Sequence, residues 1–156
     1  GQRSEFNEAN SLEWWVSDLW GHHGLQRMVK DLNGIYSSHP ALWQLDSDPA
    51  GFRWINTDDA GGNTYSWVRT DRDGRHVAAI VNFSSEPWTR YRIGLPEAGA
   101  WKEIFNSDSG IYDGSDAHGN LGQVEATDEG WNGFPASALV VVPPLGAVFF
   151  EHVPGE

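Results

Sequence analysis

The chain has 156 residues, of which 39% are hydrophobic, and this is enough for one domain with a substantial core. Twenty-two acidic residues against 10 basic ones give a formal net charge of -12, which disfavours nucleic-acid and anionic-membrane partners. The sequence has no cysteine, so disulfides and thiolate metal sites are excluded, which fits a cytoplasmic location. No apolar run approaches the roughly 20 residues that cross a bilayer.

The first residues, GQRSE, include no Met, so we expect a fragment or a processed product. Residues 22–38 are predicted to form an amphipathic helix that ends before Pro40. The helix carries one apolar stripe, and the chain offers few partners for it before the β region begins. The stripe therefore predicts packing against a larger layer; it consists of Leu25, Met28, Val29, Leu32, Ile35 and Tyr36.

Short β-like segments follow, rich in branched and aromatic residues and separated by Gly, Asp, Asn and Pro. Asp73-Gly74 predicts a hairpin turn, and Pro143-Pro144 predicts a corner that splits the last segment into two strands. Seven or eight short strands without intervening helices predict a mainly β fold, an antiparallel β-sandwich. The predicted segments are 52–55, 64–70, 75–83, 90–95, 100–106, 122–127 and 138–151.

The helix and the β region meet near residue 45 with few polar residues between them, which predicts a tight junction. We therefore divide the chain into residues 1–45 and residues 46–156. The stretch LDSDPAGFRWI (45–55) crosses this junction and places Phe52 and Trp54 two residues apart on one strand face. We expect Phe52 to be a core anchor, and Trp54 to be either core or exposed.

No constellation of catalytic residues stands out. A glycosidase needs two carboxyl groups about 5–10 Å apart, and no spacing pairs any two of these acids. His22 and His23 are neighbours on the helix and cannot face one metal ion, and the other four histidines are isolated. The Gly-rich stretch 114–122 reads as a surface loop. We assign no catalytic residue, no metal and no cofactor.

The chain contains nine Trp residues, an unusual number for this length. Indole faces stack well on the C–H faces of neutral sugars, although core packing is the default role of Trp.

Six stretches, in this order, resemble the C-terminal end of bacterial 1,4-α-glucan (glycogen) branching enzymes, members of the α-amylase clan. Together they run through nearly the whole chain: NEANSLEWW, GLQRMVKDLNGIY, HPALWQLDSDPAGFRWI, VNFSSEPWTRYRIGLP, WKEIFNSDSGIYDGS and LVVVPPL.

The resemblance implies that Gly1-Gln2 follow the last strand of a (β/α)8 catalytic barrel, that residues 22–38 are its last helix, and that residues 46–156 are a C-terminal all-β domain. Such enzymes cleave an α-1,4 glucan and transfer the chain to form an α-1,6 branch, in glycogen biosynthesis. The family's catalytic acids lie on earlier barrel strands, so the chain alone should be inactive. Its implied partners are α-glucans (glycogen, maltooligosaccharides) and the catalytic barrel of the same protein.

Members of the family also hold glucans at surface sites, and a Trp in a GFxW stretch matches Trp54. We therefore expect Trp54 to contact carbohydrate, with Trp20 as a second candidate and the remaining Trp residues mostly in the core. Two alternatives stay open, namely a free-standing α-glucan-binding module and a purely structural β-domain. An unpaired helix of barrel type argues against the free-standing module.

Overall fold

The computed structural model describes residues 7–155, so the expectation for Gly1-Gln2 lies outside the described residues. The described chain begins with the 3-10 helix η1 (Trp14–Asp18), followed by α1 (His22–Ser38), which has the predicted bounds. The short 3-10 helices η2 (Pro40–Leu42) and η3 (Pro49–Gly51) then lead into the β region, and each begins with proline, whose fixed φ suits the first helical position.

Eight strands make up the β region of the described chain, and all of their pairings are antiparallel. Each predicted segment forms a strand, and the last one forms two. The strands are β1 (Phe52–Asp59), β2 (Thr64–Thr70), β3 (His76–Asn82), β4 (Trp88–Leu95), β5 (Gly99–Asn106), β6 (Gln123–Ala126), β7 (Ala136–Val142) and β8 (Gly146–His152).

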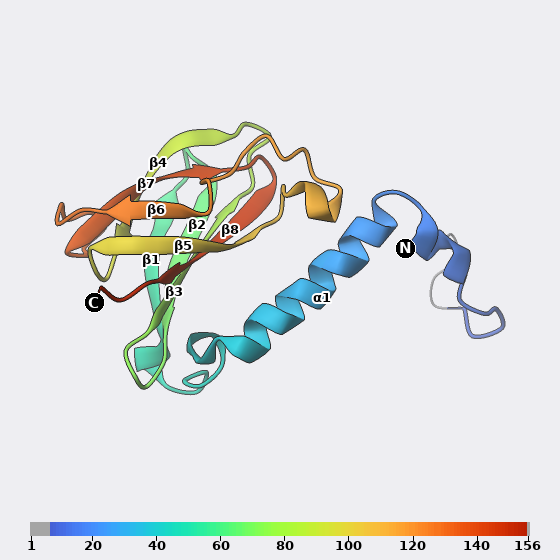
Figure 1. The fold of residues 1–156 in the computed structure, drawn as a ribbon, viewed down its shortest axis with the longest axis horizontal. Coiled ribbons are helices and arrows are strands. Elements are labelled where there is room, and N and C mark those ends of the chain that lie inside the picture. Colours follow the sequence, from blue (N-terminus) through green and yellow to red (C-terminus); the bar gives the residue numbers. More distant parts are fainter. Residues whose placement is uncertain (1–6, 156) are drawn as a thin grey trace.

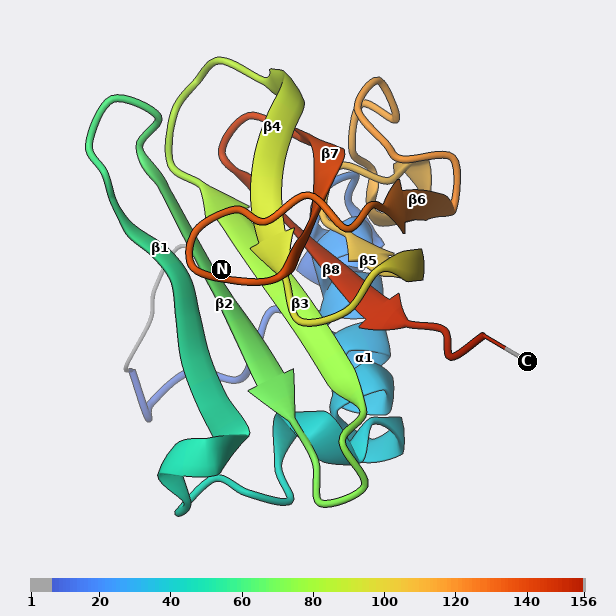
Figure 2. The ribbon, with the colours of Figure 1, turned by 90° about the vertical axis from the view of Figure 1, so that its left-hand side faces the viewer.

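The strands form two layers, as predicted for a sandwich. A six-stranded sheet has the order β1-β2-β3-β8-β5-β6, and β4 and β7 pair in a second, two-stranded sheet. Figure 2 shows β4 and β7 lying across one face of the larger sheet. Pro143 and Pro144 follow β7 directly, and the chain changes sheets between β7 and β8. Because proline cannot donate to a ladder, it suits this corner.

Asp73-Gly74 lies in the turn between β2 and β3, as predicted. Gly74 has φ +80°, a conformation that glycine adopts without steric cost. The Asp71 side chain accepts hydrogen bonds from the amides of Asp73 and Arg75, each at 2.9 Å, and this holds the turn closed.

The core fills the space between the two sheets. Its members come from both layers and are apolar, and most of them are fully enclosed. Because stabilisation grows with the apolar area removed from water, these side chains contribute most to the fold. They include Ile55, Val68, Ile80, Ile93, Leu95, Trp101, Val140, Val142, Val148 and Phe150.

The helix α1 lies on the opposite face of the six-stranded sheet, behind β3, β8 and β5 in Figure 2. Figure 1 shows the start of α1 reaching past the sandwich, beside η4 (Gly110–Tyr112). Three members of its apolar stripe, Leu25, Val29 and Tyr36, remain about half exposed. The other three, Met28, Leu32 and Ile35, are partly buried, so about half of the stripe is left uncovered within the described chain. Among residues 7–155, no helix combines the length and the apolar character that crossing a membrane requires.

Candidate functional site

Five aromatic rings lie close together on the outer face of β1 and β2, the face that carries α1. We call them the aromatic surface: Phe52 and Trp54 on β1, Tyr65 and Trp67 on β2, and Phe83 just after β3. The two-residue period of each strand places them there. Between them in sequence, Ser66 and Val68 point inward and are buried.

Trp54 occupies the centre of the aromatic surface and stands opposite Trp67 in the β1–β2 ladder. Its ring centroid lies 4.9 Å from that of Phe52, 6.1 Å from that of Trp67 and 6.4 Å from that of Tyr65. Tyr65 is in turn 5.9 Å from Phe83. Trp54 is 50% exposed, which answers the question that the sequence left open.

The expectation that Phe52 anchors the core is wrong. Phe52 is 38% exposed and packs its ring at 89° against Trp54. The physical reason is that β1 is an edge strand and Phe52 is its first residue, on the same outward face as Trp54. Ile55 supplies the buried side chain of this strand instead, beside a register shift between Trp54 and Asn56.

Trp20 does not join the aromatic surface. It is 81% exposed and lies two residues ahead of α1, whereas β1 begins beyond the other end of that helix. A helix of 17 residues is about 25 Å long, so Trp20 and Trp54 cannot belong to one carbohydrate site.

The expectation that the remaining Trp residues are mostly core is also wrong. Trp101 is fully enclosed, and Trp67 and Trp88 are partly buried. The other four are exposed: Trp14, Trp15, Trp43 and Trp131.

The sequence reasoning also missed that Tyr65, Trp67 and Phe83 belong with Trp54. A signal for two of them was present, because Tyr65 and Trp67 share a strand face by the two-residue period. What was missing was the register that pairs Trp67 with Trp54.

A polar cluster fixes the end of the β1–β2 hairpin that carries Tyr65. Tyr91 on β4 donates to the Asp59 carboxylate at 2.7 Å, and Thr64 donates to the same oxygen at 2.9 Å. Burial alone would raise the pKa of Asp59, but the hydrogen bonds from Tyr91, the Gly62 amide and Thr64 outweigh it and hold that pKa below its usual value. Trp88 adds a bond from its indole N–H to the Gly62 carbonyl, so the second sheet braces the hairpin.

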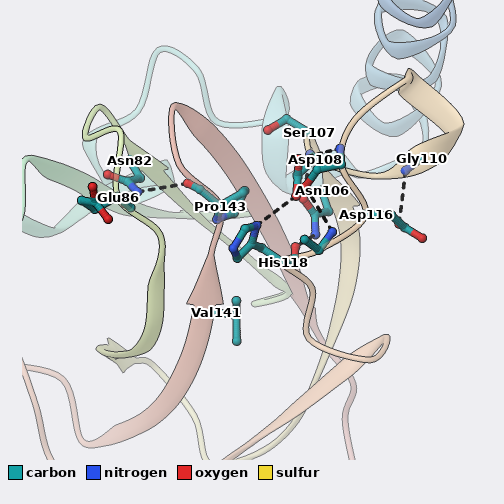
Figure 3. Close-up of polar contacts among 12 residues, drawn as sticks. Asn82, Glu86, Asn106, Ser107, Asp108, Gly110, Asp116, His118, Val141 and Pro143 are labelled. Atoms are coloured by element: carbon teal, nitrogen blue, oxygen red, sulfur yellow. Dashed lines mark hydrogen bonds and ion pairs between the residues drawn. The ribbon is translucent and has the colours of Figure 1, made fainter.

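The predicted surface loop after β5 forms a second polar region, beside a cavity of about 480 Å³. In Figure 3, Asp108 receives a contact from His118, and Asp116 turns away from them toward the Gly110 amide. Ser115 also donates to Asp108, and burial, which would raise the pKa of Asp108, is outweighed by the bonds from Ser115 and His118, which lower it. The loop's acids are thus engaged in holding the loop.

The same loop holds the start of α1. The helix begins after Gly21, which has no side chain to cap it, and the Asp113 carboxylate accepts from the amides of Gly21 and Gly24, each at 3.0 Å. A carboxylate at a helix N-terminus satisfies orphan donors and complements the helix dipole.

Within residues 7–155, no group of three or more His, Asp or Glu side chains is placed to hold a metal ion. The aromatic surface is a set of uncharged rings on an acidic protein, and the chemistry that such rings support is stacking against neutral, partly apolar groups.

Residues 54–153 match the family of the alpha amylase C-terminal all-beta domain. The chain belongs to this family. The match begins at Trp54 and ends one residue after β8, so this all-β domain spans nearly the whole sandwich.

Similar proteins carry the name 1,4-alpha-glucan branching enzyme GlgB. One from Cutibacterium acnes is 56% identical over 99% of the chain, and one from Leifsonia xyli is 47% identical over 97%. One from Mycobacterium bovis is 47% identical over 96%. The chain covers 24%, 20% and 20% of these relatives, so it spans about a quarter of their length or less.

Proposed function

We propose that the chain is the C-terminal part of a cytoplasmic 1,4-α-glucan branching enzyme, in which the all-β domain supports a catalytic barrel and contacts α-glucan through Trp54. The observation that carries the proposal is the 56% identity to a branching enzyme over 99% of the chain. Residues 1–45 then belong to the end of the barrel and residues 46–156 to the β-domain. The catalytic acids of the reaction lie outside this chain.

The exposed stripe of α1 supports attachment to a larger body rather than a free-standing binding module. Leu25 and Val29 line a largely apolar groove of about 410 Å³ together with Leu12, Trp14 and Val16. A free module would leave this apolar surface in water, at a cost of roughly 25 cal/mol for each Å². In the intact enzyme the barrel covers it.

The glucan contact is supported by three properties of Trp54. Its indole is half exposed, other rings contact it on both strands, and the nearby Arg69 side chain is paired with Asp46. A glucan has no charge for the acidic protein to repel, and its C–H faces gain from contact with the ring. Trp20 is a weaker candidate, because no ring contact among the described residues supports it.

Titration with maltoheptaose, followed by Trp fluorescence and calorimetry, tests the contact. We expect a response from the chain and its loss in Trp54→Ala. The matched control is Trp131→Ala, because Trp131 is equally exposed at 48% but lies outside the aromatic surface. If Trp54→Ala responds like the unchanged chain, the contact through Trp54 is refuted. If neither responds, the contact is refuted and the domain is structural. A branching assay on the same sample should show no turnover, and turnover would contradict our placement of the catalytic acids.

A further inference from the structure

The rings of the aromatic surface are not equivalent, because their planes stand at different angles. Phe52 and Trp67 stand at 89° and 80° to Trp54, and Phe83 stands at 81° to Tyr65. These are edge-to-face contacts, in which one ring braces another. Trp54 and Tyr65 are instead inclined to each other by 54°, with centroids 6.4 Å apart.

Trp54 and Tyr65 are also accessible together. Their side chains are 50% and 45% exposed, on adjacent strands at the edge of the sheet. Trp67, by contrast, is half-buried and helps to line a cavity between α1 and the sheet, so it supports Trp54 from below. Phe52 and Phe83 are exposed as well, at 38% and 54%, but each stands nearly perpendicular to the ring beside it. Trp54 and Tyr65 are therefore the adjacent exposed pair whose planes are inclined at an intermediate angle.

The angle between the two open rings selects the shape of ligand that can touch both. A β-1,4-linked glucan is a flat ribbon, which needs coplanar rings. An α-1,4-linked glucan turns at every linkage, so that the faces of successive sugars are inclined to one another. Two rings at 54° match a curved chain and cannot both lie flat against a ribbon.

The charge of the protein narrows the ligand further. Nucleobases also stack on paired aromatic rings, but the phosphate backbone that carries them is repelled by a protein with a net charge of -12. A neutral curved glucan fits the inclination of the two rings and is not repelled by the negative charge of the protein.

From this geometry we propose that Trp54 and Tyr65 form one two-faced site for consecutive sugars of a curved α-1,4-glucan, and that Tyr65 determines its preference for that linkage. The inference rests on the proposed glucan contact of Trp54 and extends it to a second residue on β2. It predicts that Tyr65 matters for chains long enough to reach both rings and matters little for a ligand that covers one ring.

Binding of maltose, maltoheptaose and cellohexaose to the chain, measured by calorimetry, tests the proposal. Tyr65→Leu keeps an apolar, strand-compatible side chain and removes the flat ring, whereas Tyr65→Phe keeps the ring and removes the hydroxyl. A ring contact of this kind is worth a change of about threefold to tenfold in affinity. We therefore expect Tyr65→Leu to weaken maltoheptaose binding by about threefold to tenfold and maltose binding by less than about twofold. Tyr65→Phe should bind both like the unchanged chain, and cellohexaose should not compete.

Each contrary outcome is decisive. If Trp54→Ala abolishes binding and Tyr65→Leu does not weaken the longer chain, the two-faced site is wrong while the Trp54 contact stands. If cellohexaose competes as well as maltoheptaose, the linkage preference is wrong. If the chain binds no glucan, both proposals fail, and sedimentation that shows Tyr65-dependent dimers would assign the rings to a second copy instead. Thermal unfolding of each variant confirms that it is folded.

Discussion

Two glycines of α1 provide a matched test of how the helix docks on the β-domain. A Cβ added at Gly24 would lie 2.2 Å from the carbonyl oxygen of Tyr112 and 2.6 Å from a carboxylate oxygen of Asp113. A Cβ added at Gly34 would meet nothing within 4 Å. Both substitutions to Ala improve helix propensity, by roughly 0.5–1 kcal/mol, so any difference between them comes from the contact.

The structure sets the size of that difference. Because backbone cannot yield as a flexible side chain can, Gly24→Ala must push the loop away from α1. The shift disrupts the two hydrogen bonds that the Gly21 and Gly24 amides donate to Asp113, and the 2.7 Å hydrogen bond that Arg27 donates to the Ile111 carbonyl. Three hydrogen bonds at about 1 kcal/mol each outweigh the gain in propensity. We expect Gly24→Ala to lower the free energy of unfolding by about 1–3 kcal/mol, and Gly34→Ala to raise it by about 0.5–1 kcal/mol.

Urea unfolding gives the global values, and amide hydrogen exchange along α1 locates the change. In Gly24→Ala, protection from exchange should fall first in the opening turns of α1, because the hydrogen bonds between the loop and the helix are lost there. If Gly24→Ala is as stable as Gly34→Ala and equally protected, the close docking of α1 on the loop is wrong.

Two further predictions concern the polar contacts of the sandwich. Tyr91→Phe removes the hydroxyl that bonds to Asp59 and Thr64. The free energy of unfolding, measured in urea, should therefore fall by about 1–2 kcal/mol, and the pKa of Asp59, measured by NMR titration, should rise. Unchanged values would show that the cluster does not stabilise the fold. Burial, partly opposed by Glu97, holds the pKa of His76 below its ordinary value of 6.5. The unfolded chain therefore takes up a proton at His76 more readily than the folded chain does. The folded state is favoured fully above about pH 6.5, and this advantage is lost as the pH falls further. The melting temperature should therefore drop between about pH 7.5 and about pH 5, and less in His76→Gln; equal drops would contradict this.

Local patterns were enough to predict most of the architecture. The helix stripe, the alternation within each β segment and the turn at Asp73-Gly74 are encoded within a few residues, and each was confirmed. The proline pair also marked the corner, because a missing N–H is a local property. What these patterns could not supply was which strands become neighbours, since that depends on contacts between segments far apart in the chain.

At the candidate site, too, local patterns predicted single residues but not the neighbours that distant segments supply. Trp54 was predicted from its motif, but its companions Tyr65 and Phe83 come from other segments and meet it only through the sheet. Phe52 was misplaced because alternation tells which residues share a face and not which face is covered.

The sequence by itself determined the class of fold, the bounds of α1 and the position of each strand. The tertiary structure alone decided that β1 is an edge strand, that Trp54 is open to solvent, and that the exposed ring of Tyr65 on the neighbouring strand is inclined to it by 54°. The physical reason is that composition and periodicity act along the chain, whereas exposure and the angle between two rings depend on strand register and on which layer lies above them.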